Sequence, residues 1–333
     1  MPPRHWWRTA LRLQVRPLPN LTGSPRPPRK SRCRVRTRFS EVSADYPDDL
    51  REQVDNFLRQ LTFADGATTA GLEEAMLYSL MAGGKRIRPV LSLATASALG
   101  ADPREVLPFA AAIEMVHSYS LIHDDLPAMD DDDLRRGKPS CHVAFGEDVA
   151  ILAGDALYAE AFNLILTRQQ GEPRLLLDAA AELAAATGVN GMVGGQYIDV
   201  EAIAVDGPEG LRELHGRKTG RLINASVECI CLLQGVDADS LKAYRDFARE
   251  LGILFQIVDD ILDVTGSDDE LGKPSGSDER HGKRTYVSEF GLAQANELAS
   301  VSHRQTREAL AKAAPKGADQ LERITDFIAS RDS

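Results

Sequence analysis

The sequence predicts an all-α fold, a large single-domain bundle built around central helices. From about residue 45 onward, apolar residues recur at spacings of three and four, as on one face of a helix. Alternating apolar and polar runs, which indicate strands, are scarce. Several predicted helices are apolar on most faces, which is typical of helices that are surrounded by others.

The first residues differ from the rest of the chain. The forty N-terminal residues carry eleven Lys or Arg and no Asp or Glu, and they are rich in proline. Arg4, Arg8, Arg12 and Arg16 would line one side of a helix, which is typical of an organellar transit peptide. A disordered tail or a start placed too far upstream explains the same composition. We therefore assign 1–44 to a basic extension and 45–333 to the functional domain.

Helices are predicted where Ala and Leu dominate, and breaks where Gly, Pro and Asp cluster. In order, the clearest helical stretches are 90–99, 108–123, 150–167 and 178–186. The breaks lie near 65–66, 100–103, 171–173, 206–208, 235–237 and 266–278. About ten helices result. No change of composition after residue 45 marks a second domain.

Composition excludes several classes of protein. With 333 residues and 43% hydrophobic content, the chain can bury a large core. The body has 28 of the 39 basic residues against all 50 acidic ones, so it is unlikely to bind nucleic acid non-specifically. No apolar run is predicted to span a membrane. The four cysteines show no CxxC spacing, which favours a reducing, cytoplasmic compartment, or an organelle if the extension is a transit peptide.

Two aspartate clusters lie inside apolar stretches, where ionised groups are costly without a counter-charge. In the first, Asp124 and Asp125 follow an apolar helix, and Pro127 predicts a helix end or distorted turn that could bring Asp130 back to Asp124. The run 131–133 is interpreted as a solvated loop. Because Mg²⁺ binds one or two carboxylates together with substrate phosphates, the cluster indicates a metal-bound diphosphate.

The second cluster lies within a predicted helix. Asp259 and Asp263 are four residues apart and share a face, whereas Asp260 is turned roughly 100° away. One face therefore presents two carboxylates to a metal.

Basic residues accompany both clusters. Each alone is more often a surface cation than a ligand, but together they suit diphosphate oxygens. They lie in Gly83-Gly84-Lys85-Arg86-Ile87-Arg88, Arg135-Arg136, Lys218-Thr219-Gly220, Lys273 and Lys283. The paired glycines before Lys85 allow the backbone to approach an anion or another helix closely.

From about residue 45 to the end, these motifs resemble the trans-isoprenyl diphosphate synthases, most closely the bacterial type of farnesyl diphosphate synthase. Further matches in order are Ala153-Gly154-Asp155, Gly194-Gly195-Gln196, Phe255-Gln256, Leu271-Gly272-Lys273 and Lys283-Arg284-Thr285-Tyr286. The resemblance implies head-to-tail condensation of isopentenyl diphosphate with dimethylallyl and geranyl diphosphates in a deep cavity, by a homodimer. It implies Mg²⁺ as cofactor, roughly three ions per site, with Mn²⁺ as a substitute.

The resemblance also implies roles for individual residues. The metal ligands would be Asp124, Asp125, Asp130, Asp259 and Asp263. The allylic diphosphate would be held by Arg135, Lys218, Gln256, Lys273 and Lys283, and isopentenyl diphosphate by Lys85, Arg88, His117 and Arg136. The catalytic set would be Asp124, Asp130, Asp259, Arg135, Lys218 and Thr219. Without the resemblance, His117 is interpreted as an ordinary helix histidine.

Tyr119 and Ser120 are the candidates for control of chain length. Tyr119 lies five residues before Asp124, about one and a half helical turns deeper along the helix. In the resembled family an aromatic residue here closes the tunnel and stops growth at fifteen carbons, which predicts farnesyl diphosphate. An ordinary core tyrosine is the alternative.

Rival functions have their own signatures. A geranylgeranyl diphosphate synthase differs only in product length, so this function remains the alternative to a farnesyl diphosphate synthase. A terpene cyclase usually replaces the second aspartate motif by a mixed Asn, Ser or Thr and Glu motif. A ferritin-like protein needs two Glu-x-x-His motifs, of which only Glu114 to His117 occurs. A non-enzymatic metal-binding protein would not need the basic residues.

Overall fold

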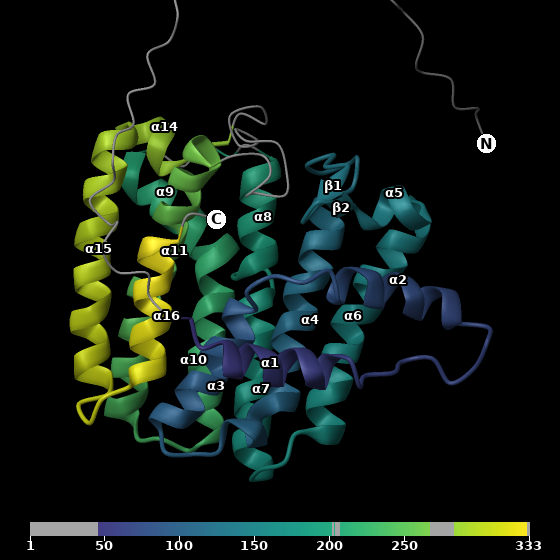
Figure 1. Cartoon of the computed structure of the whole chain (residues 1–333), viewed down its shortest axis with the longest axis horizontal. Helices are drawn as coiled ribbons and strands as arrows, with labels where there is room; N and C mark the ends of the chain where they lie inside the picture. The colour runs from purple at the N-terminus through teal and green to yellow at the C-terminus, as the bar shows by residue number, and fades with distance from the viewer. Residues whose placement is uncertain (1–45, 202, 204–206, 267–282, 332–333) are drawn as a thin grey trace, which may run out of the picture. The chain divides into compact units, whose positions relative to one another are not determined.

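The computed structural model describes residues 46–201, 203, 207–266 and 283–331, and all statements below concern these residues. They form helices almost throughout, as the sequence predicts (Figure 1). A short antiparallel pair, β1 (Leu134–Arg135) and β2 (Lys138–Pro139), is the one sheet in this part of the chain. The predicted basic extension lies outside the described residues.

The first half of the bundle contains the helices that lead to the first aspartate cluster and those that follow it. They are α1 (Asp48–Leu58), α2 (Ala70–Leu80), α3 (Ile87–Ala98), the 3₁₀ turn η1 (Pro103–Val106), α4 (Leu107–Asp124), α5 (Cys141–Phe145), α6 (Glu147–Arg168), α7 (Pro173–Thr187) and α8 (Met192–Val200).

The second half carries the second cluster on its longest helix. Its elements are α9 (Gly207–His215), the π-helical turn η2 (Gly216–Gly220), α10 (Arg221–Leu233), α11 (Ala238–Thr265), α14 (Tyr286–Phe290), α15 (Leu292–Ala313) and α16 (Asp319–Ser330).

The four clearest predicted stretches are confirmed as α3, α4, α6 and α7, with boundaries that differ by a few residues. The start of α7 differs most, because Pro173 occupies the first turn and the Glu172 side chain accepts a hydrogen bond from the Leu175 backbone N–H. The described residues contain more helical segments than the ten predicted, since short helices such as α5 and α14 leave too little periodicity to detect.

Helices α4 and α10 are the central helices that the apolar pattern predicts. Most side chains of α4 from Phe109 to Ile122 are buried, and so are most of α10 from Leu222 to Leu233. Helix α4 packs against α3 and α6, while α10 packs against α3, α7 and α11. Apolar side chains on nearly every face of a helix are stable only where neighbours cover every face.

Helices α4 and α11 carry the two aspartate clusters at their C-terminal ends. Both ends lie toward the top of Figure 1, near β1, β2 and α14. This common end of the bundle holds the candidate site.

One described helix, α6, is long and apolar enough to cross a membrane, judged by length and composition alone. Core helices of soluble proteins pass the same test. Helix α6 packs against α2, α4 and α5, so this observation is weak evidence for a membrane span.

Candidate active site

The first aspartate cluster begins at the end of α4. Asp124 is the last residue of the helix, and its carbonyl accepts a hydrogen bond from the Asp130 backbone N–H at 2.9 Å. The chain therefore turns back after Pro127, which confirms the predicted helix end. Asp131 and Asp133 are exposed, in agreement with the interpretation of 131–133 as a solvated loop, but Asp132 differs, because it lines the cavity described below and lies 3.4 Å from Arg135 Nη2.

The second cluster lies on the last turns of α11, and its carboxylates serve different purposes. Asp259 and Asp263 line the cavity described below. Asp260 is buried and accepts hydrogen bonds from the Tyr286 backbone N–H at 2.6 Å and from Gln256 Nε2 at 2.7 Å. Asp260 also borders the cavity, but these hydrogen bonds join α11 to α14.

Both clusters line one cavity of about 440 Å³. Most of the residues predicted for the site line it too, although they come from distant parts of the sequence. These are Lys85, Arg88, His117, Asp124, Asp130, Arg135, Arg136, Lys218, Thr219, Gln256, Asp259, Asp263 and Lys283.

Three of the predicted residues that the structure describes are not among those that line this cavity. Asp125 is buried and paired with the Arg135 guanidinium. Tyr119 and Ser120 lie on α4, where the Tyr119 ring packs edge-on against Tyr158 with 5.0 Å between ring centroids. Lys273 lies outside the described residues.

Cationic side chains in the cavity contact its carboxylates directly. Lys218 Nζ lies 2.5 Å from Asp199 Oδ2, and Lys283 Nζ lies 2.8 Å from Asp130 Oδ2. Gln196 Nε2 donates to Asp124 Oδ1 at 2.7 Å. These contacts hold the Lys218 and Lys283 ammonium groups close to the aspartates.

A second group of cations occupies the wall formed by the start of α3 and by α4. Arg88 Nη1 lies 3.4 Å from His117 Nε2, and Arg136 donates to the Gly83 carbonyl. Gly84 has φ +109°, and a Cβ atom there would lie 2.7 Å from Arg136 Cζ. This φ is strained for any residue with a side chain, so glycine is favoured here, although the neighbouring atoms belong to the movable end of the Arg136 side chain rather than to backbone.

Burial changes the acidity of several of these groups. It raises the pKa of Asp124 to about 6, and it lowers the pKa of Arg88 to about 10. Burial, together with the nearby Arg88, also holds the pKa of His117 well below its usual value, so the imidazole is neutral at pH 7. A desolvated carboxylate such as Asp124 favours a bound cation, whose charge would offset the cost of its burial.

The donor set fits Mg²⁺ that is shared with a phosphate ligand. The available ligands on the two cavity walls are hard carboxylate oxygens from Asp124, Asp130, Asp259 and Asp263. Within the described ranges, no three Asp, Glu, His or Cys side chains lie close enough together to form a metal cage by themselves. Mg²⁺ commonly takes one or two carboxylates and completes its shell with substrate phosphates and water, so this arrangement suits it.

The structure adds site residues that the sequence pattern did not reveal. Arg331 follows α16 and lines the cavity, with Nη2 at 3.1 Å from Asp259 Oδ1 and the guanidinium 4.3 Å from the Phe255 ring centroid. Asp199 and His215 line it too. Asp199 falls three residues after Gln196, so helical spacing could have found it. No local signal points to Arg331.

Backbone strain is concentrated at this end of the bundle. In the described part of the chain, the non-glycine residues with positive φ are Arg86 (54°), Asp131 (52°) and Arg136 (54°). Arg86 and Arg136 line the cavity, and Asp131 follows Asp130. Left-handed conformations cost free energy in such residues and persist only where the surroundings impose them.

An all-α bundle whose cavity combines two aspartate clusters with Lys and Arg side chains defines an enzyme that handles a diphosphate through carboxylates. The chain belongs to the polyprenyl synthetase family, whose model matches residues 69–327. It is therefore a prenyltransferase that joins isoprene units head to tail. The family assignment decides against a ferritin-like or purely metal-binding protein.

Similar proteins share most of the chain. A farnesyl diphosphate synthase of Geobacillus stearothermophilus is 46% identical over 79% of this chain and 89% of its own length. A chloroplastic geranylgeranyl pyrophosphate synthase of Catharanthus roseus is 45% identical over 79% and 74%, respectively. The solved geranyltransferase of Helicobacter pylori, complexed with magnesium and isoprenyl diphosphate, is 32% identical with a TM-score of 0.77, over 85% of this chain and 98% of its own.

Proposed function

We propose that the enzyme condenses isopentenyl diphosphate with dimethylallyl and then geranyl diphosphate, with farnesyl diphosphate as its main product. The observation that carries this proposal is the cavity in which Asp124 and Asp130 face Asp259 and Asp263, with cations on two walls. Two substrates that each bear a diphosphate need two separate cationic groups, and the cavity has both.

The allylic substrate is assigned to the aspartates. Asp124, Asp130 and Asp259, with Asp125 and Asp263 nearby, would hold roughly three Mg²⁺ ions that bind its diphosphate, and Mn²⁺ would be a substitute. When bound, the ions neutralise the charge of the departing diphosphate. Hydrogen bonds come from a second set of residues, namely Arg135, Lys218, Gln256, Lys273 and Lys283. These donors stabilise the leaving group, so that the carbon–oxygen bond ionises to an allylic cation.

Isopentenyl diphosphate is assigned to Lys85, Arg88, His117 and Arg136. This set anchors the second diphosphate so that its double bond faces the allylic cation, and Thr219 helps to position the reacting carbons. The double bond attacks the cation, a new carbon–carbon bond forms, and a proton passes to the departing diphosphate. The low pKa of His117 supports a neutral imidazole that donates one hydrogen bond rather than a charge.

Farnesyl diphosphate is favoured over geranylgeranyl diphosphate by Tyr119. Its buried ring packs against Tyr158 of α6, deeper along α4 than Asp124. Two adjoining aromatic rings form a wall that a growing chain meets after it passes the metal end, and Ser120 adds a small neighbour. Relatives of both product lengths have comparable identity, so the product rests on this feature.

The test is to incubate the purified enzyme with Mg²⁺, isopentenyl diphosphate and labelled dimethylallyl or geranyl diphosphate, and to identify the product. A fifteen-carbon diphosphate is expected. A twenty-carbon product would favour the geranylgeranyl alternative, and a cyclic hydrocarbon would overturn the proposed condensation.

We also propose a homodimer formed through α6. Leu152 and Leu166 of this helix are 55% and 59% exposed and lie on the same face, together with exposed Ala159 and the polar residues Asp155 and Asn163. The neighbouring Val143 of α5 is 49% exposed. Exposed apolar side chains that gather on one face are typical of an interface, and burial by a second copy also accounts for the apolar character of α6.

The compartment and the domain boundaries complete the proposal. Cys141, Cys229 and Cys231 are buried free thiols, which supports a reducing, cytoplasmic compartment. An organelle stays the alternative, since several relatives are described as chloroplastic. We assign residues 45–333 to the prenyltransferase domain and 1–44 to an extension without a catalytic role.

A further inference from the structure

Arg86 lies between two residues of the proposed isopentenyl diphosphate subsite, Lys85 and Arg88, but its side chain points away from the substrate. It is the left-handed residue immediately before α3, and only 1% of its side chain is exposed. A cation so deeply buried needs partners, and it has them on three sides.

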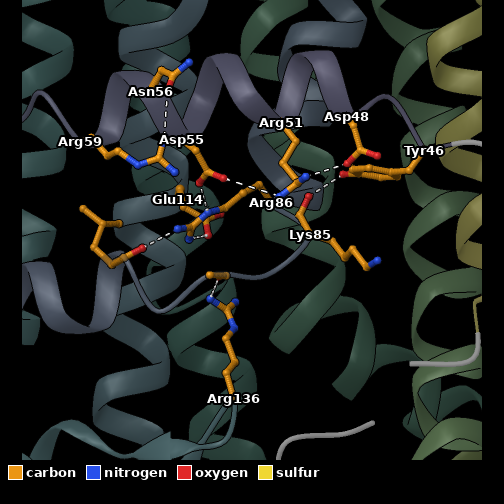
Figure 2. Close-up of polar contacts among 12 residues, drawn as sticks. Tyr46, Asp48, Arg51, Asp55, Asn56, Arg59, Lys85, Arg86, Glu114 and Arg136 are labelled. Carbon is orange, nitrogen blue, oxygen red and sulfur yellow. Dashed lines mark hydrogen bonds and ion pairs between the residues drawn. The ribbon is translucent and has the colours of Figure 1, made fainter.

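The three partners come from three different helices (Figure 2). Arg86 Nε donates to Asp55 Oδ1 of α1 at 3.0 Å, and Nη1 donates to Glu114 Oε1 of α4 at 2.7 Å. Nη2 donates to the carbonyl of Leu80, the last residue of α2, at 2.7 Å. The Glu114 side chain is only 2% exposed, so this ion pair is shielded from water and from salt.

This network fixes the backbone of the subsite. A left-handed arginine is unfavourable by itself, and the contacts of its guanidinium with Asp55 and Glu114 hold it there. The turn at Arg86 lies between Lys85 and the start of α3, which carries Arg88, and both of these residues line the cavity. A second contact acts on the same loop, because the Tyr46 hydroxyl donates to the Lys85 carbonyl at 2.8 Å (Figure 2).

Glu114 also links this loop to the rest of the subsite. It lies one helical turn before His117 on α4. Its charge opposes the lowering of the pKa that burial causes in Arg88 and Arg136. A carboxylate repels diphosphate, so its presence at the cavity edge is explained by the neighbouring arginines rather than by the substrate.

We infer that Arg86, held by Asp55 and Glu114, is a positioning residue that sets Lys85 and Arg88 for the diphosphate of isopentenyl diphosphate. The inference rests on the proposed function, which assigns that substrate to this wall. Replacing a buried ion pair by neutral groups can raise or lower protein stability. Stability alone therefore does not separate a positioning role from a purely structural one, whereas the separate KM values for the two substrates do.

The test compares Glu114→Gln, which keeps the shape of the side chain, with Glu228→Gln. Glu228 forms a similar ion pair with Arg245, between α10 and α11, and does not line the cavity. For Glu114→Gln we expect KM for isopentenyl diphosphate to rise about tenfold, while KM for geranyl diphosphate changes less than about twofold. Glu228→Gln should leave both KM values unchanged.

Two further variants keep the test decisive. Asp55→Asn removes one charge at a partly exposed position and serves if Glu114→Gln does not fold. Arg86→Lys retains the charge but loses the planar fork, so the rise in KM for isopentenyl diphosphate should persist. Equal changes in both KM values, or a lower Tm with unchanged KM values, would overturn the positioning role.

The unaltered enzyme separates this inference from the proposed function. If it forms no prenyl product from the two substrates, the proposed function fails and the inference with it. If it forms product normally while the Glu114→Gln enzyme keeps an unshifted KM for isopentenyl diphosphate, only the inference fails.

Discussion

Asp259 and Asp260 are neighbours in the sequence, yet their carboxylates serve different parts of the molecule. Asp260 is buried and holds the backbone of α14, whereas more than half of the Asp259 side chain is exposed to the cavity. The 100° rotation per residue of a helix explains this division, and it allows the two to be tested separately.

Replacing Asp259 with Asn should lower turnover by about a hundredfold or more, because a charge that stabilises the leaving group is lost. Helix content by circular dichroism should stay unchanged and Tm should change little, since more than half of this side chain is exposed and the Asn oxygen can still accept a hydrogen bond from Arg331. Asp131→Asn, at an exposed loop position, is the matched control and should leave turnover intact. Normal turnover of the Asp259→Asn enzyme at saturating Mg²⁺ would refute the metal assignment.

Tyr119 is the residue on which the product length depends. Tyr119→Ala should remove the ring that packs against Tyr158, and the main product should shift to twenty carbons or more while the first condensation continues. Tyr119→Phe keeps the ring and should still give fifteen carbons. Chromatography of the dephosphorylated products decides between these outcomes, and an unchanged distribution from folded Tyr119→Ala enzyme would exclude the role.

At the scale of elements, α8 and the π-helical turn η2 are in unusually close contact. A Cβ atom on Gly195 would lie 2.3 Å from the Lys218 backbone nitrogen, so only glycine allows the two segments to approach. Lys218 in turn pairs with Asp199 of α8. π-helical turns occur frequently at functional sites, and here one presents Lys218 and Thr219 to the cavity.

Gly195→Ala should push α8 away from η2 and displace Lys218. We expect a loss of about 1–3 kcal/mol in the free energy of unfolding together with reduced turnover. Gly66→Ala is the control, because a Cβ atom there meets nothing within 4 Å. A variant at Gly195 with unchanged denaturant midpoint and unchanged turnover would show that the close approach is unimportant.

The long helices were predictable from sequence, whereas several details of the site were not. Apolar periodicity identifies α4 and α6 because burial acts on every turn of a long helix. The π-helical turn at η2 leaves no periodic signal, and Arg331 reaches Asp259 from 72 positions away in the chain. The aspartate motifs were visible because carboxylates stand out in apolar surroundings, but Asp125 and Asp260 show that membership of a motif does not fix where a side chain points.

At the scale of the whole molecule, the basic extension is the first open question. An enzyme that begins at Val42 should fold and turn over like the full chain, because Pro-rich basic sequence has no apolar core to contribute. Tyr46, whose hydroxyl contacts the Lys85 carbonyl, is retained in it. Thermal unfolding and turnover of the two forms provide the comparison, and insoluble or inactive shortened protein would show that the extension belongs to the fold.

The proposed dimer is tested at the exposed face of α6. Leu152→Asp combined with Leu166→Asp should convert a dimer to a monomer, because two carboxylates would be desolvated at the interface. Sedimentation velocity measures the change. Leu292→Asp, at another exposed leucine, on α15, is the control and should leave the dimer intact. An unaltered enzyme that sediments as a monomer would contradict the proposal.

The left-handed residues around the cavity set a limit on engineering for heat resistance. Exchanging Arg136 for glycine would relieve its backbone, but the same exchange would delete a cation of the proposed isopentenyl diphosphate subsite. Selection for a higher Tm alone would therefore favour variants that have lost substrate-binding residues at the catalytic end of the bundle. Libraries designed for thermal tolerance should place their substitutions at the opposite end of the bundle, where a change that stabilises the backbone removes no residue of the active site.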